Sequence, residues 1–319
     1  MQELITCPRQ VATCLVPSAI YHTIGNTPLI SLRAASEATG CNILAKAELL
    51  NPSGSIKDRV AQFLIDEAEK RGEIQPGGTI LEVTSGNTGI ALSMVGAMRG
   101  YKVVIMMPRS VSQERRNMIR SYGAELHLLD ELLHMHAAVA RAIEIAKRDP
   151  LVFLPSQFSN PDNPRCHELK TGVEILTQTG GKIDAFVMGV GTGGTLMGVA
   201  RALRSAGCRA QVVAVEPAES AVMSGGPPGC HGIQGLADGF IPEIVRLDEI
   251  DRIIKVTTLE ARERADRLAK EEGVLAGISS GANLVAAEEV ARGLGPGHTV
   301  VTILPDRGER YLSLAQQSP

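Results

Sequence analysis

The feature of this sequence that most constrains its fold is a regular alternation of short apolar runs with longer amphipathic segments. The short runs, many of them rich in valine and isoleucine, lie at residues 43–47, 79–83, 103–107, 125–129, 185–190, 211–215 and 299–304. Between them, apolar residues recur at three- and four-residue spacing at residues 59–71, 89–99, 112–122, 136–147, 195–205 and 259–272. Strands that alternate with helices are typical of parallel sheets covered by helices on both faces. The sequence therefore predicts an α/β fold with mostly parallel sheets.

The length of the chain predicts two lobes. Its 319 residues exceed the roughly 150 residues of a common domain. A break in composition at residues 151–164, where proline and asparagine are frequent, separates the two halves. We expect the chain to cross there from one lobe to the other.

Composition and charge exclude several classes of protein. A net charge of −3, the absence of tryptophan and the scarcity of other aromatic residues argue against binding of nucleic acid or an anionic membrane. No apolar run approaches the roughly 20 residues of a membrane span, and the first residues do not match a signal peptide. The cysteines, which form no C-x-x-C pair, are Cys7, Cys14, Cys41, Cys166, Cys208 and Cys230. We expect a cytoplasmic protein with reduced thiols and no metal site.

A glycine-rich loop follows the apolar run at 185–190 and precedes a predicted helix. It consists of Gly191, Thr192, Gly193, Gly194 and Thr195. Glycines let the backbone wrap closely around an anion, and a helix N-terminus adds positive potential and N–H donors. The loop matches neither G-x-G-x-x-G nor a Walker sequence. We interpret it as a phosphate-binding loop, with a tight structural turn as the alternative.

A second loop, at residues 84–89, has the same position between a strand and a helix. It carries hydroxyl and amide side chains at Thr84, Ser85, Asn87 and Thr88. Such a loop suits a carboxylate that needs several hydrogen bonds at a helix N-terminus. The alternative is simple helix capping by Ser85 or Thr88, which would use one of these side chains but not all of them.

A third loop, at residues 51–59, places Lys57 at the start of a predicted helix. The helix dipole there favours anions, and burial together with this field lowers the pKa of an amine and leaves it nucleophilic. A surface lysine is the alternative. No G-x-S-x-G elbow is present, and the histidines show no metal-binding spacing. A lysine, a phosphate loop and a carboxylate loop together indicate a pyridoxal-phosphate site that acts on an amino acid.

At these residues the sequence resembles the cysteine synthase/cystathionine β-synthase family of pyridoxal-phosphate enzymes of fold type II, and most of all its O-acetylserine sulfhydrylases. The matching motifs, in order, are IGNTPL at 24–29, the lysine signature at 46–59, TSGNTG at 84–89, QFSNPDNP at 157–164, GTGGT at 191–195, IQGLADGFIP at 233–242, GISSGAN at 277–283 and GERYLS at 308–313. The resemblance runs from about residue 21 to residue 313.

The resemblance implies a role for each candidate residue. Lys57 is the lysine that binds the cofactor, Asn87 hydrogen-bonds its ring oxygen, and Ser279 faces its pyridine nitrogen. The phosphate is bound by Gly191, Thr192, Gly193, Gly194 and Thr195. The substrate carboxylate is held by Thr84, Ser85, Gly86, Thr88 and Gln157.

The resemblance also implies the fold and the domains. We expect two three-layer αβα lobes with the cofactor in the cleft between them. Residues 1–50 and 160–319 are expected to form the larger, phosphate-binding domain. Residues 51–159 are expected to form a smaller, mobile, substrate-binding domain.

The implied activity is β-replacement, which forms L-cysteine from O-acetyl-L-serine and sulfide through an α-aminoacrylate intermediate. An O-phosphoserine sulfhydrylase or a cystathionine β-synthase is the alternative within the family, because Arg109 and the segments 132–136, 170–172 and 237–239 depart from the commonest family sequences. A serine/threonine dehydratase usually carries a glycine where Val60 stands. A homodimer is expected. Binding of a serine acetyltransferase tail is a possible partner role, either beside catalysis or, as the non-enzymatic alternative, on a catalytically silent scaffold.

Overall fold

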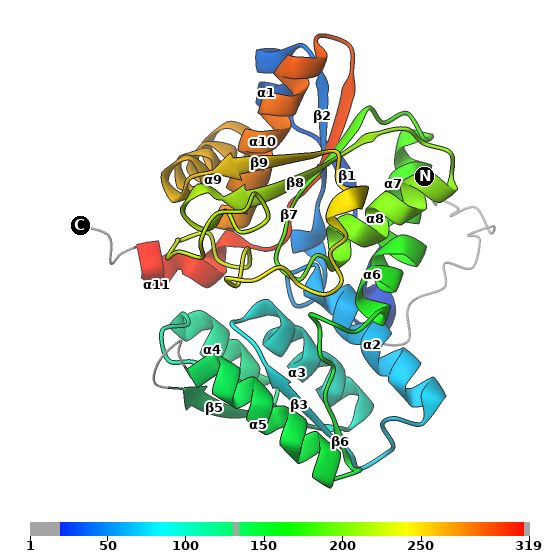
Figure 1. The fold of residues 1–319 in the computed structure, drawn as a ribbon, viewed down its shortest axis with the longest axis vertical. Coiled ribbons are helices and arrows are strands. Elements are labelled where there is room, and N and C mark those ends of the chain that lie inside the picture. The colour runs from blue at the N-terminus through cyan, green and yellow to red at the C-terminus, as the bar shows by residue number, and fades with distance from the viewer. Residues whose placement is uncertain (1–19, 130–133, 316–319) are drawn as a thin grey trace, which may run out of the picture.

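The computed structural model describes residues 20–129 and 134–315, which fold around two separate sheets (Figure 1). The six-stranded sheet has the order β1-β2-β10-β7-β8-β9, and the four-stranded sheet has the order β5-β4-β3-β6. The strands are β1 (Leu29–Ser31), β2 (Asn42–Lys46), β3 (Thr79–Val83), β4 (Lys102–Pro108), β5 (Glu125–Leu129), β6 (Val152–Phe153), β7 (Ala185–Gly189), β8 (Gln211–Pro217), β9 (Arg252–Val256) and β10 (Thr299–Ile303).

Every strand pairing is parallel except one. The edge strand β1 runs antiparallel to β2, with Leu29 opposite Lys46. The pairs β2–β10, β10–β7, β7–β8 and β8–β9 are parallel, as are β3–β4, β3–β6 and β4–β5. The prediction of an α/β fold with two lobes and mostly parallel sheets is therefore confirmed.

Helices occupy most of the remaining chain. The α-helices are α1 (Arg33–Thr39), α2 (Lys57–Arg71), α3 (Asn87–Arg99), α4 (Gln113–Ser121), α5 (His134–Arg148), α6 (Asp162–Cys166), α7 (Val173–Thr179), α8 (Gly194–Ser205), α9 (Thr258–Glu272), α10 (Ile278–Leu294) and α11 (Leu312–Ala315). A π-helix, η3 (His167–Gly172), connects α6 to α7. Short 3₁₀ turns include η2 (Glu48–Leu50) and η6 (Gly308–Tyr311).

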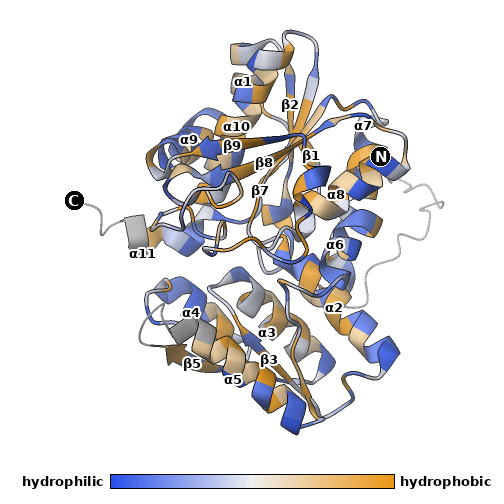
Figure 2. Ribbon diagram, in the orientation of Figure 1, coloured by the Kyte–Doolittle hydropathy of each residue, from blue (hydrophilic) through white to orange (hydrophobic). Residues whose placement is uncertain are grey.

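The larger sheet is covered on both faces because its strand residues alternate between two cores. Ala185 and Val187 of β7 pack with α1, α9 and α10 on one face. Phe186 and Met188 of the same strand pack with α7 and α8 on the other face. This period of two follows from the pleat of a strand. Figure 2 shows hydrophobic residues concentrated on the strands at the centre of each lobe.

The smaller sheet repeats the same arrangement. Ile80 of β3 packs with α2, α3 and α4 on one face. Leu81 and Val83 pack against Ala138 and Ala142 of α5 on the other face. The loops that follow β3 and β7 lie on the sides of the two lobes that face each other (Figure 1).

The described residues include four of the cysteines. Cys41, Cys166, Cys208 and Cys230 are free thiols, whereas Cys7 and Cys14 lie outside the described residues, as does part of the departing segment 132–136. No helix in the described part of the chain combines the length and hydrophobicity that crossing a bilayer requires.

Candidate active site

The predicted phosphate loop lies between β7 and α8, and its three glycine positions have no room for a larger residue. Gly193, which precedes the helix, has a φ of +84°, a conformation that favours glycine. A Cβ atom at Gly191 would lie 2.2 Å from the carbonyl oxygen of Gly235, and one at Gly194 would lie 2.0 Å from Oδ1 of Asn163. The first turn of α8 contains no acidic residue, and its N–H groups lack acceptors within the helix. The loop is therefore a closely packed anion cradle.

The two threonine hydroxyls of this loop are fixed by buried side chains. Asn163 Nδ2 donates to Thr192 Oγ1 at 3.0 Å. Thr195 Oγ1 lies 3.2 Å from Nε2 of His167, whose Nδ1 lies 3.0 Å from Thr171 Oγ1. Burial lowers the pKa of His167 well below its usual value. A neutral imidazole therefore holds the Thr195 hydroxyl in place.

The predicted carboxylate loop lies at the N-terminus of α3. The N-cap residue is Gly86, and no side chain caps the helix, so the reading that Ser85 or Thr88 serves as the cap is wrong. Thr84 Oγ1 accepts a hydrogen bond from Gly86 N at 3.2 Å, and Thr88 Oγ1 donates to Gln157 Oε1 at 2.7 Å. Ser85 is exposed, and its side chain forms no hydrogen bond with any other residue that the structure describes.

A chain of hydrogen bonds joins the two loops. From Thr88 it reaches the Gln157 side chain, and the Gln157 carbonyl then accepts from Asn163 Nδ2 at 2.8 Å. The same Asn163 amide contacts Thr192 of the phosphate loop. Loops that follow strands of two different sheets are therefore connected through buried polar groups.

Lys57 is the first residue of α2 and is partly buried. Burial lowers the pKa of its amine to about 8, against the opposing influence of the nearby acidic groups of Asp238, Cys166 and Glu82. The described residues give its Nζ no hydrogen-bond partner. The predicted lowering of the pKa is therefore confirmed, and the amine is available for reaction near neutral pH.

Two carboxyl groups lie within electrostatic reach of this lysine. Glu82 is buried in β3, where Oε1 accepts from Val83 N at 3.0 Å while Oε2 has no partner. Burial raises the pKa of Glu82 to about 8, so this group is mainly protonated at neutral pH. Burial also raises the pKa of Asp238, which follows Ala237 with its φ of +44°.

Three segments that carry candidate residues meet at Asp306, a buried residue at the end of β10. Asn87 Nδ2 donates to Asp306 Oδ2 at 2.6 Å. The backbone N–H of Gly277, two residues before the buried Ser279, donates to the Asp306 carbonyl at 3.0 Å. Ser55, two residues before Lys57, forms an antiparallel bridge with Asp306. The loops of Lys57, Asn87 and Ser279 are thereby held around one residue, Asn87 through its carboxylate and the other two through its backbone.

These groups suit pyridoxal phosphate. The cradle before α8 fits a phosphate because glycines are sterically required there and backbone donors are available. An amine of lowered pKa suits covalent attachment to the carbonyl of the cofactor. An amide at Asn87 and a buried hydroxyl at Ser279 supply neutral polar contacts for a heteroaromatic ring. Within the described ranges, no cluster of three or more His, Cys, Asp or Glu side chains could hold a metal ion.

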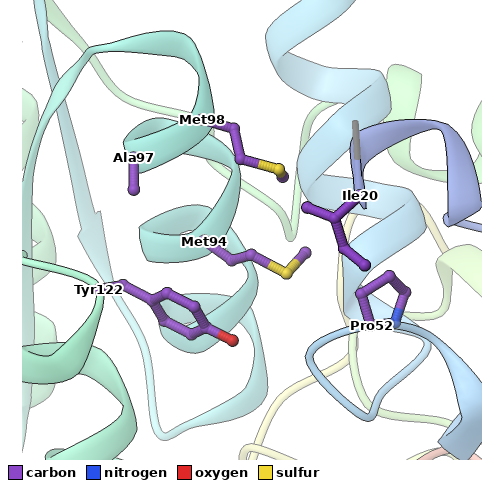
Figure 3. Close-up of a pocket in the computed structure, with 6 residues that line it drawn as sticks. All are labelled: Ile20, Pro52, Met94, Ala97, Met98 and Tyr122. Carbon is purple, nitrogen blue, oxygen red and sulfur yellow. The ribbon is translucent and has the colours of Figure 1, made fainter. Parts of the chain in front are cut away.

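A separate cavity of about 320 Å³ contains none of the predicted site residues. Its lining is apolar, with Met94, Met98 and Tyr122 on one side and Ile20 and Pro52 on the other (Figure 3). It lies against α3 and suits no charged ligand.

The structure adds residues that the sequence did not single out for a role. They are Glu82, Asn163, His167, Asp306 and Arg310. Asn163 lies inside the motif at 157–164 and Arg310 inside the motif at 308–313. These motifs mark both positions but do not indicate the role of either side chain. The signal for Glu82 was a lone charge inside an apolar strand, since charged residues are rarely buried without a reason.

Comparisons with known proteins agree with these features. The family model described as pyridoxal-phosphate dependent enzyme matches residues 20–306. A cysteine synthase of Staphylococcus aureus (strain Mu50 / ATCC 700699) is 51% identical over 295 residues, which cover 92% of this chain and 95% of that protein. Among solved structures, a cysteine synthase from Entamoeba histolytica is 40% identical with a TM-score of 0.90, over 99% of this chain and 94% of that chain. An O-ureido-L-serine synthase is 42% identical with a TM-score of 0.89, over 93% and 94% of the two chains.

Proposed function

This chain belongs to the family of pyridoxal-phosphate dependent enzymes, and we propose that within this family it is a cysteine synthase. It converts O-acetyl-L-serine and sulfide to L-cysteine and acetate. The bond from Cβ to the acetate oxygen breaks, and a bond from Cβ to sulfur forms. The observation that carries the proposal is an amine of lowered pKa at Lys57, in a chain that is 51% identical to a cysteine synthase.

The cofactor is held at both ends in this proposal. Lys57 binds it covalently, Asn87 donates to its ring oxygen, and Ser279 faces its pyridine nitrogen. The phosphate is bound by Gly191, Thr192, Gly193, Gly194 and Thr195. The supports are the glycine cradle before α8 and the buried position of Ser279. Ser279 would offer the ring nitrogen a neutral hydroxyl group rather than a carboxylate.

The substrate carboxylate binds at the N-terminus of α3, to Thr84, Ser85, Gly86, Thr88 and Gln157. The helix dipole and free N–H groups favour an anion there. The bond between Thr88 and Gln157 pre-orients both side chains.

Lys57 then acts as the base. When bound, pyridoxal phosphate supplies an electron sink that stabilises negative charge at Cα. The Lys57 amine removes the Cα proton and returns it after sulfur has added. A pKa near 8 suits both directions of this transfer. The neighbouring Asp238 favours the protonated amine, because its negative charge raises the pKa of Lys57.

Residues 51–159 form the smaller domain, which moves to close over the substrate, and residues 1–50 and 160–319 form the larger domain. The four strands of the smaller sheet all lie between residues 79 and 153, which supports this division. Closure excludes water from the reacting carbon atoms.

The proposal is tested by incubating the purified, cofactor-loaded protein with O-acetyl-L-serine and sulfide and measuring L-cysteine. Rapid formation of L-cysteine is expected, together with a change in the visible spectrum on adding O-acetyl-L-serine alone that sulfide reverses. Lys57→Ala should abolish both signals, whereas Lys182→Ala, which changes an exposed lysine far from the site, should not. No L-cysteine from O-acetyl-L-serine, with product from O-phospho-L-serine or homocysteine instead, would replace the proposed substrates.

The assembly and location of the protein are part of the proposal. A homodimer in the cytoplasm is supported by the free thiols and by the apolar cavity of Figure 3, beside which Ile20 is 53% exposed. Light scattering of the purified protein should give twice the mass of the chain. We also propose that the tail of a serine acetyltransferase binds between the two lobes. A peptide with the sequence of such a tail should then compete with O-acetyl-L-serine for binding.

A further inference from the structure

Asn87 has charged partners at both ends of its side-chain amide. Its Nδ2 donates to Asp306 Oδ2 at 2.6 Å. Its Oδ1 accepts from Nη1 of Arg310 at 2.5 Å. Asp306 and Arg310 both belong to the segment that follows β10, more than 200 residues away in sequence.

These partners allow only one orientation of the amide. An ionised carboxylate only accepts hydrogen bonds, and a guanidinium group only donates them. Rotating the Asn87 amide by 180° would therefore set oxygen against oxygen at Asp306 and N–H against N–H at Arg310. One N–H of Asn87 remains unused, so the amide can offer a ligand a donor from Nδ2.

Asp306 is itself firmly held. The Tyr311 hydroxyl donates to the same Oδ2 that accepts from Asn87. The backbone of Asp306 is paired with Ser55 and with Gly277. Its Oδ1 is buried without a partner, and a Cβ atom at Gly277 would lie 2.1 Å from it. A buried carboxylate oxygen without a partner costs free energy.

Arg310 is held equally well. Its Nη2 donates to the carbonyl oxygen of Ser53, and its own carbonyl accepts from Ser112 Oγ at 2.7 Å. It is buried, with a relative exposure of 3%. Both partners of Asn87 therefore have fixed positions of their own.

We propose that Asp306 and Arg310 are positioning residues that fix the Asn87 amide so that Nδ2 donates to the ring oxygen of pyridoxal phosphate. This inference rests on the proposed cofactor contact of Asn87 and assigns it two supporting residues. With the opposite orientation, the amide oxygen would face the ring oxygen and repel it.

The test measures two properties of the bound cofactor: its visible absorbance band and its dissociation constant. Asp306→Ala should shift the band and weaken cofactor binding by about tenfold, the effect of about 1.4 kcal/mol. Asp306→Asn keeps an acceptor oxygen for Asn87 and should retain most of the wild-type band. In an Asn87→Ala background, Asp306→Ala should change neither property further, because no amide is left to orient.

Controls separate this role from a structural one. Tyr311→Phe removes the other donor to Asp306 and should leave the band in place. Thermal unfolding of each variant shows whether it folds, and Asp306→Asn provides a readout if Asp306→Ala does not. Equal effects of Asp306→Ala with and without Asn87, or no effect at all, would overturn the inference. If Asn87→Ala leaves the absorbance band unchanged, Asn87 does not contact the cofactor, and the positioning role of Asp306 and Arg310 is also overturned. The proposed function is tested separately, by L-cysteine formation with the wild-type protein.

Discussion

The guanidinium of Arg59 and the carboxylate of Glu48 form a two-point ion pair that is entirely removed from solvent. Nε and Nη2 of Arg59 donate to the two oxygens of Glu48 at 2.7 and 2.8 Å, and both side chains have zero exposure. A second pair joins Arg59 Nη1 to Glu174 at 2.6 Å. Because Arg59 lies two residues after Lys57, these pairs anchor the first turn of α2 to η2 and α7.

Removing Arg59 should destabilise the fold. Arg59→Met leaves Glu48 buried without its cationic partner, with only the neutral side chains of Thr27 and Asn51 as donors, and breaking a buried ion pair in this way costs about 3–5 kcal/mol. Unfolding in guanidinium chloride should show this loss. Arg33→Met, which removes one partner of the exposed Arg33–Glu37 pair, should hardly alter the free energy of unfolding. If Arg59→Met and Arg33→Met lower the free energy of unfolding equally, the buried pair does not stabilise the fold more than the exposed pair.

Attachment of the cofactor should depend on pH through Lys57. Only the neutral amine attacks a carbonyl group, and the pKa of Lys57 is about 8. The rate at which cofactor-free protein binds pyridoxal phosphate should therefore rise with pH and level off above about 8. Stopped-flow absorbance measures this profile.

Asp238→Asn should move the midpoint of that profile to lower pH. The Asp238 charge raises the pKa of Lys57, so removing the charge lowers this pKa and enlarges the neutral fraction at neutral pH. Asp248→Asn, at an exposed site outside the cleft, should leave the midpoint unchanged. A midpoint that stays in place or rises in Asp238→Asn would show that this carboxylate does not act on the lysine.

Gly191→Ala should weaken cofactor binding by at least tenfold, because its Cβ would lie 2.2 Å from the Gly235 carbonyl oxygen and the loop must move. Equilibrium dialysis against pyridoxal phosphate measures the change. Gly293 offers a matched control, since it lies in α10 with nothing within 4 Å of the new Cβ. Gly293→Ala should raise the free energy of unfolding by roughly 0.5–1 kcal/mol and leave cofactor affinity unchanged.

Replacing Asn163 should weaken the binding of both the substrate and the cofactor, whereas replacing Thr88 should weaken the binding of the substrate alone. Asn163→Ala removes the donor to the Gln157 carbonyl and to Thr192, so both the KM for O-acetyl-L-serine and the dissociation constant of the cofactor should rise by several fold. Thr88→Val removes the hydroxyl that donates to Gln157 and that binds the substrate carboxylate in the proposal, so it should raise KM alone. If Asn163→Ala changes a single constant, the hydrogen-bond chain does not connect the two loops functionally.

Most strands could be predicted from the sequence, including the edge strand β5 of the smaller sheet, whereas the edge strands β1, β6 and β9 could not. The run at 79–83 coincides with β3, and the run at 125–129 coincides with β5. The strands β1 and β6 have only three and two residues, too few to form a recognisable apolar run. The strand β9 carries exposed residues at two of its five positions, among them Lys255, which interrupts its apolar run. The helix α10 is largely buried and rich in small residues, so it has no amphipathic pattern from which it could be predicted.

The loops of the site could be predicted because their glycines and hydroxyl residues lie close together in sequence. The cluster around Asp306 could not, because Asn87 and Asp306 are 219 residues apart. A local sequence pattern does not indicate a contact between residues so far apart. For the same reason, the role of Asn163 became visible only when its amide was found between Gln157 and Thr192.

Pairing of β2 with β10 places Asn42 beside Thr299, so the centre of the larger sheet needs a strand from the far end of the chain. During synthesis, the four-stranded sheet has all its strands once residue 153 has emerged from the ribosome. The six-stranded sheet must wait for nearly the whole polypeptide, and long-range strand pairing is slow to form. Asp306 lies three residues after the end of β10, which makes assembly of the proposed cofactor site one of the last events in the maturation of the newly made protein.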